Sequence, residues 1–401
     1  MYLIPTILLR TLPLLLLLLF NTFSVEAQSR LEKKLQKDLS KHGKDPTKYV
    51  LDKIHKHDLL VFDDGFHHAE EPFLFYEELV RNPEFSKNID FIFIEVFHTD
   101  AQESLDLFFD APSKEFSILY EVFQHDYSGY GWPYESYINL LSTIWDVKHQ
   151  IHEISRLKVI AVSPPIYWEA IQSKKDYDRF LKTLDTRDYF MYHTILMQME
   201  NFKNGKKGIF LTNTRHAYKI IYNQSGEPYW NTNAFFDHFY PEKAFSIRFH
   251  HLFLSVVKKK EVIQEHNTSE GLENFEFSFI QAANGLWEKA FCKNQGLKVG
   301  LDFKHTAFGR TPYLGNHSLN IQKNTLMSDA YDGLIFLAPV EKIGKSRRTV
   351  FFITESFKLE LKRRIEILQG DNLQEFLNAS NVTSLGDWIN IFAKGPKEDL
   401  N

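Results

Sequence analysis

Cysteine is almost absent from this chain of 401 residues, in which Cys292 stands alone. A single cysteine cannot form an intrachain disulfide, and it excludes zinc sites built from several cysteines. An excess of basic residues is also missing, because 47 Lys and Arg residues stand against 52 Asp and Glu residues. A chain with a formal net charge of −5 lacks the positive surface that neutralises phosphates, so we expect no nucleic-acid partner.

Several familiar catalytic and nucleotide-binding motifs are missing as well. Gly344-Lys345-Ser346 lacks the upstream glycine of a P-loop, and Gly129-Tyr130-Gly131 lacks the third glycine of a dinucleotide fingerprint. The chain contains neither the G-x-S-x-G elbow of serine hydrolases nor the H-E-x-x-H motif of zinc peptidases. What is present is an ordinary globular composition, with 43% hydrophobic and 25% charged residues. The 36 Phe and 18 Tyr residues allow a large aromatic core.

The N-terminus has the pattern of a targeting segment. Arg10 precedes a short apolar run, residues 12–20, and small residues follow at Val25 and Ala27. This order is typical of a cleaved signal peptide, which we expect to comprise residues 1–27. The run is shorter than the roughly 20 residues of a membrane-spanning helix, so we expect no integral membrane span after cleavage. A secreted or periplasmic location follows from this interpretation.

Strands and helices are predicted to alternate along the remaining chain. Residues 28–57 are polar and charged, and they are typical of a mobile N-terminal arm or a short surface helix. Apolar runs predict strands over residues 58–62, 89–97, 157–162, 208–213, 244–249 and 333–338. Helical spacing covers residues 70–81, most of 101–156, 174–184, 187–204 and 355–369. The pattern predicts an α/β domain over residues 58–345, with a mainly parallel central sheet and helices on both faces. A C-terminal helical segment over residues 346–401 completes the predicted organisation.

Acidic residues and histidines follow the first predicted strand, where ligands bind in parallel sheets. This stretch contains Asp64, His67 and Glu71. If a helix begins near His67, then His67 and Glu71 lie one turn apart on one face. A carboxylate in that position can orient an imidazole and raise its basicity, as a general base requires. With Asp64 as a further ligand, the same residues also suit a divalent metal, and the sequence leaves both readings open.

Three further polar residues are expected at the same edge of the sheet. Glu95 is an acid inside an apolar run, a costly position unless the side chain faces the crevice beyond the strand ends. Arg187 opens a predicted helix, and His216 follows the fourth strand. Structural roles are the alternatives: Glu95 can pair with Arg187 inside the fold, and His216 can be a satisfied interior histidine.

These strand-end residues resemble the motifs of the superfamily that contains erythromycin esterases, ChaN-like haem-uptake proteins and Tiki-type proteins. The family pattern Gly-Glu-x-x-His is similar to residues 63–67, followed by Glu71. The family has a glutamate near the end of its second strand, and Glu95 matches it. The family also has a helix that begins with an Arg followed four residues later by Met, and residues 187–191 match this motif. A histidine after a later strand is matched by His216, and a late strand by residues 331–336. The resemblance covers residues 57–340.

The resemblance implies an extracytoplasmic hydrolase that acts on an ester or related bond of a small molecule. It implies catalytic roles for a set of five residues: His67, Glu71, Glu95, Arg187 and His216. The alternatives are a ChaN-like haem- or metal-binding protein without turnover and a Tiki-like metallopeptidase, with Asp64, His67, Glu95 and His216 as metal ligands. The cofactor therefore stays open between none, a divalent metal ion and haem. Asp64 stands where the family has glutamate, so its carboxylate is one methylene shorter.

Overall fold

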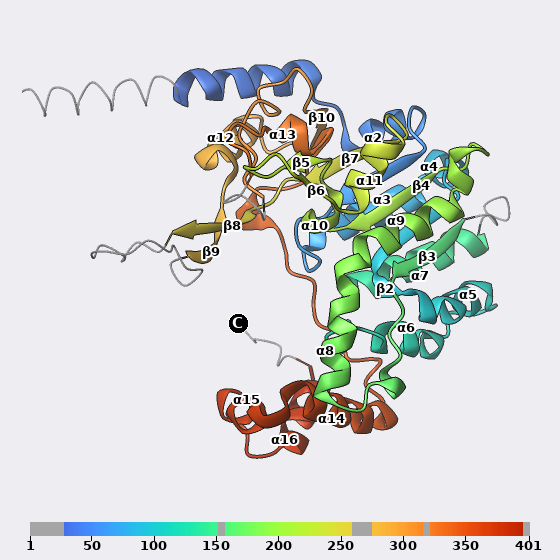
Figure 1. Ribbon diagram of the computed structural model, residues 1–401. Coiled ribbons are helices and arrows are strands. Elements are labelled where there is room, and N and C mark those ends of the chain that lie inside the picture. The colour runs from blue at the N-terminus through green and yellow to red at the C-terminus, as the bar shows by residue number, and fades with distance from the viewer. Residues whose placement is uncertain (1–27, 151–156, 259–274, 316–320, 396–401) are drawn as a thin grey trace, which may run out of the picture.

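The computed structural model describes residues 28–150, 157–258, 275–315 and 321–395 (Figure 1). Its centre is a seven-stranded sheet in the order β10-β11-β7-β1-β4-β2-β3. The strands, in that order, are Val299–Asp302, Gly333–Phe336, Ala244–Phe249, Leu59–Asp63, Gly208–Thr212, Phe91–His98 and Lys158–Ser163. All neighbouring strands are parallel except β10 and β11. The predicted α/β class with a mainly parallel sheet is therefore confirmed, although the antiparallel edge strand β10 was not predicted.

Helices cover both faces of the sheet because successive strand residues point to opposite sides. In β1, Leu60 and Phe62 belong to one apolar core, and Leu59 and Val61 belong to the other. The first core is covered by α2 (Pro46–Ile54), α3 (Glu70–Arg81), α4 (Pro83–Asn88), α5 (Gln102–Asp110), α6 (Tyr120–Gln124) and α7 (Glu135–Gln150). The second is covered by α9 (Arg187–Gln198), α10 (Thr214–Ala217), α11 (Thr232–Phe239), α12 (Leu286–Lys293) and α13 (Met327–Ala330).

The polar segment 28–57 is not a mobile arm. Residues 28–42 are helical, and Leu35 and Leu39 are buried in the second core. In α2, the Tyr49 hydroxyl donates a hydrogen bond to Asp302 Oδ1 over 2.7 Å. Most of the charged residues that suggested an arm lie on the outer sides of two helices, and buried Lys53 pairs with Asp302. The buried apolar positions of these helices are spaced by helical turns. The prediction of a separate arm was therefore wrong, and its alternative of a surface helix was closer.

Residues 337–354 connect the sheet to the C-terminal helices, which pack on the α/β domain. α14 (Glu355–Gln369) agrees with the predicted helix, and α15 (Leu373–Ala379) and α16 (Leu385–Ala393) follow it. Phe357, Leu361 and Ile365 of α14 belong to the first core. α14 also contacts α8 (Lys174–Thr183), and both lie in the lower part of Figure 1. These contacts tie the C-terminal segment to the sheet-bearing part of the molecule.

Two short antiparallel pairs accompany the main sheet. β5 (Ile221–Tyr222) pairs with β6 (Pro228–Tyr229), and β8 (Phe253–Lys258) pairs with β9 (Phe275–Ile280). No helix in the part of the chain that the structure describes is long and apolar enough to cross a membrane. The expected signal peptide, residues 1–27, lies outside the described residues.

Candidate functional site

The candidate site lies where three adjacent parallel strands, β1, β4 and β2, end. Asp64 and His67 follow β1, and Asn213 and His216 follow β4. Glu95 belongs to β2, but the regular pairing of β2 stops at Ile94. This irregularity allows an acidic side chain in an otherwise apolar strand to face the crevice. Arg187 is the first residue of α9, which runs beside these strands.

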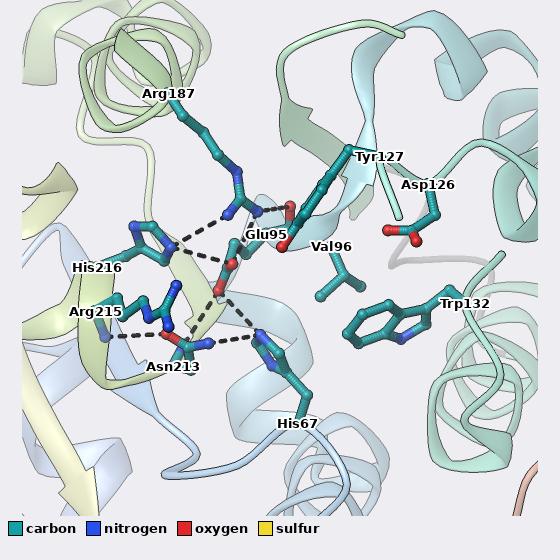
Figure 2. Close-up of a pocket in the computed structure, with 10 residues that line it drawn as sticks. All are labelled: His67, Glu95, Val96, Asp126, Tyr127, Trp132, Arg187, Asn213, Arg215 and His216. Atoms are coloured by element: carbon teal, nitrogen blue, oxygen red, sulfur yellow. Dashed lines mark hydrogen bonds and ion pairs between the residues drawn. The ribbon is translucent and has the colours of Figure 1, made fainter. Parts of the chain in front are cut away.

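Glu95 is the centre of the site, and only 2% of its surface is exposed. One carboxylate oxygen, Oε1, accepts a hydrogen bond from Arg187 Nη2 over 2.9 Å and lies 3.3 Å from His216 Nε2. The other oxygen, Oε2, lies 3.4 Å from His67 Nε2 and accepts a hydrogen bond from the Asn213 backbone N–H (Figure 2). Burial alone would raise the pKa of Glu95, but the charges of His216, His67 and Arg187 hold it well below the ordinary value. Glu95 is therefore an anion shared by three cationic groups.

Each histidine at Glu95 has a second carboxylate on its other ring nitrogen. His67 Nδ1 lies 3.0 Å from Asp64 Oδ2, and His216 Nδ1 lies 2.7 Å from Asp188 Oδ1. Burial opposes protonation of His67, but Asp64 and Glu95 raise its pKa to about 10. Burial likewise opposes protonation of His216, and Asp188 and Glu95 raise its pKa to about 9. Both imidazoles are thus held as imidazolium ions near neutral pH.

Asp64 keeps one oxygen free for further contacts. Its side chain is buried, and Oδ1 has no hydrogen-bond partner among the described residues. Burial raises the pKa of Asp64 to about 6, although His67 acts against this shift. The Tyr137 hydroxyl lies 3.1 Å from His67 Nδ1, and the ring of Trp132 meets the His67 ring edge to face. These contacts fix the plane of the His67 imidazole.

Glu71 does not belong to this group, contrary to the predicted pairing with His67. The helix α3 begins at Glu70, so His67 lies in the preceding turn and shares no helix face with Glu71. Both Glu71 oxygens instead accept hydrogen bonds from the Gly344 backbone N–H, over 3.0 and 2.8 Å. Glu71 therefore holds the C-terminal connecting segment against α3, and Asp64 is the carboxylate that orients His67.

Glu71→Ala is expected to lower the free energy of unfolding by about 1–3 kcal/mol, because the Gly344 N–H loses a charged acceptor. Turnover per folded molecule should stay close to that of the unchanged protein. Chemical denaturation and kinetics on the same preparation measure the two effects. A large loss of kcat with unchanged stability would restore Glu71 to the catalytic set.

The sequence predicted five of the residues that meet in this cluster but missed some of their partners. The structure brings Asp64, His67, Glu95, Arg187 and His216 together, whereas Glu71 stays outside. Asp188, the residue after Arg187, was not predicted to join this group, and its contact with His216 was missed. Asn213, whose Nδ2 lies 2.9 Å from His67 Nε2, was also missed. A polar residue directly after a parallel strand was the available signal for Asn213.

Two adjoining cavities give access to this cluster. The inner cavity, of about 60 Å³, is lined by His67, Glu95, Asp126, Trp132 and other residues drawn in Figure 2. The outer cavity has a volume of about 600 Å³. Tyr127, Arg187, Arg215 and His216 line both of them. A substrate held in the outer cavity can therefore present one small group to the charged cluster.

The charged cluster does not fit a divalent metal ion as it is arranged. Among the described residues, no group of three or more His, Cys, Asp or Glu side chains is placed to hold one. The Arg187 guanidinium already supplies a cation to Glu95, and the ring nitrogens of His67 and His216 lie against carboxylates. Haem ligation through either histidine meets the same difficulty, because both ring nitrogens of His67 and of His216 already lie against carboxylates.

Several solved structures have a similar fold. A crystal structure described as a succinoglycan biosynthesis protein has a TM-score of 0.52 at 11% identity, covering 80% of this chain and 98% of that one. A Bacillus cereus protein has a TM-score of 0.49 at 13% identity and covers 77% and 99%. A mutant of erythromycin esterase EreC in its open conformation has a TM-score of 0.49 at 11% identity and covers 74% and 94%. No protein-family model and no curated protein matches the sequence. The likeness is one of fold, and it agrees with the predicted fold class.

Proposed function

We propose that this protein is a hydrolase that cleaves an ester or a related bond of a small molecule by direct attack of water. The observation that carries the proposal is the placement of two carboxylate-backed histidines on opposite oxygens of Glu95, at the base of a cavity. Paired acid and base groups with raised pKa values in a cleft are typical of sites that move protons.

The proposed reaction begins with neutral His67, which takes a proton from a water molecule through Nε2 as the water oxygen attacks the carbonyl carbon. The carbonyl becomes an oxyanion, and the Arg187 guanidinium and the His216 imidazolium are the nearest groups that can stabilise it. The tetrahedral intermediate then loses the alcohol, and the His67 imidazolium returns its proton to the leaving oxygen. One water is consumed, and one acid and one alcohol are formed. Asp64 stabilises the imidazolium that forms in the first step.

The rate is expected to rise with pH across the alkaline range, because the base must be neutral and Asp64 and Glu95 hold the pKa of His67 at about 10. Below that pKa, kcat/KM should increase about tenfold per pH unit. Asp64→Asn removes one of the two anions that raise the pKa of His67, so the rise should move to lower pH. The plateau should also fall, because the neutral amide no longer stabilises the imidazolium. The profile is measured with a panel of small esters between pH 6 and pH 10.

The same ester assay is repeated with a chelator present. Hydrolysis by His67 and water should continue in the presence of EDTA. Loss of turnover with EDTA and its return with a divalent ion would replace the proposed mechanism by a metal-dependent one. If Asp64→Asn does not shift the pH profile of kcat/KM, His67 is not the group whose titration sets that profile.

We also propose that the protein acts outside the cytoplasm, because residues 1–27 have the order of charge, apolar run and small residues typical of a signal peptide. N-terminal sequencing of the protein recovered from a secreting host tests this directly. A new N-terminus at Gln28 supports export, and an intact Met1 in the soluble cell fraction contradicts it.

A further inference from the structure

The outer cavity contains a positive charge that the proposed hydrolysis does not use. Arg215 is exposed and lines both the inner and the outer cavity. Its backbone N–H donates to Asn213 Oδ1, and this bond fixes the start of α10. Within the described ranges, no acidic side chain lies close enough to its guanidinium to form an ion pair. Arg215 can therefore pair with an anion that a ligand brings.

The other charged groups of the outer cavity are already paired. Arg187 donates to Glu95 and to Ser163 Oγ, both over 2.9 Å. Asp188 accepts hydrogen bonds from the Thr232 backbone N–H and hydroxyl, in addition to its contact with His216. Among the described residues that line the outer cavity, Arg215 is the charged group left to interact with a charge on the substrate, and that charge must be negative.

Aromatic and aliphatic side chains form the rest of the outer cavity. Trp230 lines it with 40% of its surface exposed, and Tyr229 and Leu254 line it as well. The Trp230 ring is held in place by stacking on Phe235, with ring centroids 5.0 Å apart and an angle of 17°. A fixed indole beside apolar side chains suits a flat or ring-shaped apolar group.

We infer that the substrate is an anionic ester: a ring-bearing molecule whose carboxylate or phosphoryl group pairs with Arg215, with its ring against Trp230. This inference rests on the proposed hydrolase function and names the substrate class of the same site. Arg215 lies where the two cavities meet, so an anion held there leaves the ester bond within reach of the inner cavity. A guanidinium binds planar carboxylates and tetrahedral phosphoryl groups through paired hydrogen bonds.

The kinetic test compares aryl esters that share one ring and differ in a remote substituent: a carboxylate, its carboxamide or a trimethylammonium group. In the unchanged protein, kcat/KM should be about tenfold higher for the carboxylate than for the carboxamide, and lowest for the cation. Arg215→Gln should remove this order, and Arg215→Glu should reverse it. Arg310→Gln is the matched control, because Arg310 is exposed and lines neither cavity, and it should keep the order.

A binding measurement separates this inference from the proposed function. Phenylacetate, phenylphosphonate and phenylacetamide are titrated calorimetrically into the full chain. At least one anion should bind about tenfold more tightly than the amide, and Arg215→Gln should abolish the difference. This result would support the inference even if no ester were hydrolysed, in which case only the proposed function fails. Equal binding of anions and amide, or a preference that survives in Arg215→Gln, would overturn the inference while leaving ester hydrolysis intact.

Discussion

His67→Gln is expected to lower kcat/KM for ester hydrolysis by about 10²- to 10⁴-fold, the usual contribution of a positioned general base. Glutamine keeps a polar group near Glu95 but cannot accept a proton from water at any pH used. The alkaline rise of the pH profile should disappear together with the activity. Both effects are measured by steady-state kinetics on protein whose circular dichroism matches that of the unchanged chain.

His68→Gln is the matched control for this substitution. His68 is the next residue in the chain, and its ring lies against Phe66 and Tyr134 rather than against Glu95. We expect His68→Gln to keep the activity and the pH profile of the unchanged protein. Equal losses in the two variants would point to a disturbed turn after β1, and full activity in His67→Gln would disprove the proposed role of His67.

Arg248→Met is expected to lower the free energy of unfolding by about 3–5 kcal/mol, because it leaves a buried carboxylate without its counter-ion. Arg248 in β7 pairs with Asp63 at the end of β1, and 1% and 0% of their surfaces are exposed. Asp63 also accepts hydrogen bonds from the hydroxyls of Tyr331, over 2.6 Å, and Thr214, over 3.0 Å. Denaturant titration followed by circular dichroism measures the loss.

The double variant Asp63→Asn with Arg248→Met separates the buried charge from the lost packing. Because the asparagine is neutral, the double variant should be more stable than Arg248→Met alone. If the double variant loses as much free energy of unfolding as the two single variants together, the Asp63 and Arg248 side chains are not energetically coupled. This pair lies beside the charged cluster around Glu95 but lines neither cavity, so its role is to hold β1, β7 and the start of α10 together.

The sequence predicted the strands of the sheet well because parallel strands buried on both faces are continuous apolar runs. It also predicted which residues meet at the carboxyl edge, because a parallel sheet brings those ends together wherever the strands lie in the chain. Strand β10 escaped prediction, since only its residues Val299–Asp302 are paired and Gly300 interrupts the apolar pattern. Residues 28–57 were predicted to be an arm because the charged residues of this segment outnumber its buried residues.

The pairing of Glu71 with His67 failed for a different reason. It depended on where one helix begins, and helix ends are the least certain part of any pattern. The helix begins three residues later than predicted, so the carboxylate that orients His67 is that of Asp64 and not that of Glu71. The role of Asp188 was missed because a residue at a helix start has a local explanation, and a contact with a residue far along the chain leaves no local trace.

The parallel arrangement of β1, β4 and β7 also bears on how the charged cluster around Glu95 forms during folding. Asp63 pairs in register with Thr212 on one side and with Arg248 on the other, so each pairing closes a loop that contains several helices. Loop-closure entropy must be overcome before such distant contacts stabilise the chain, and folds of high contact order are slow to form. The groups around Glu95 come from the ends of β1, β4 and β2, so a fragment that lacks one of these three strands lacks part of the cluster. The charged cluster around Glu95 is therefore a property of the completed sheet, and it forms late and cooperatively during folding.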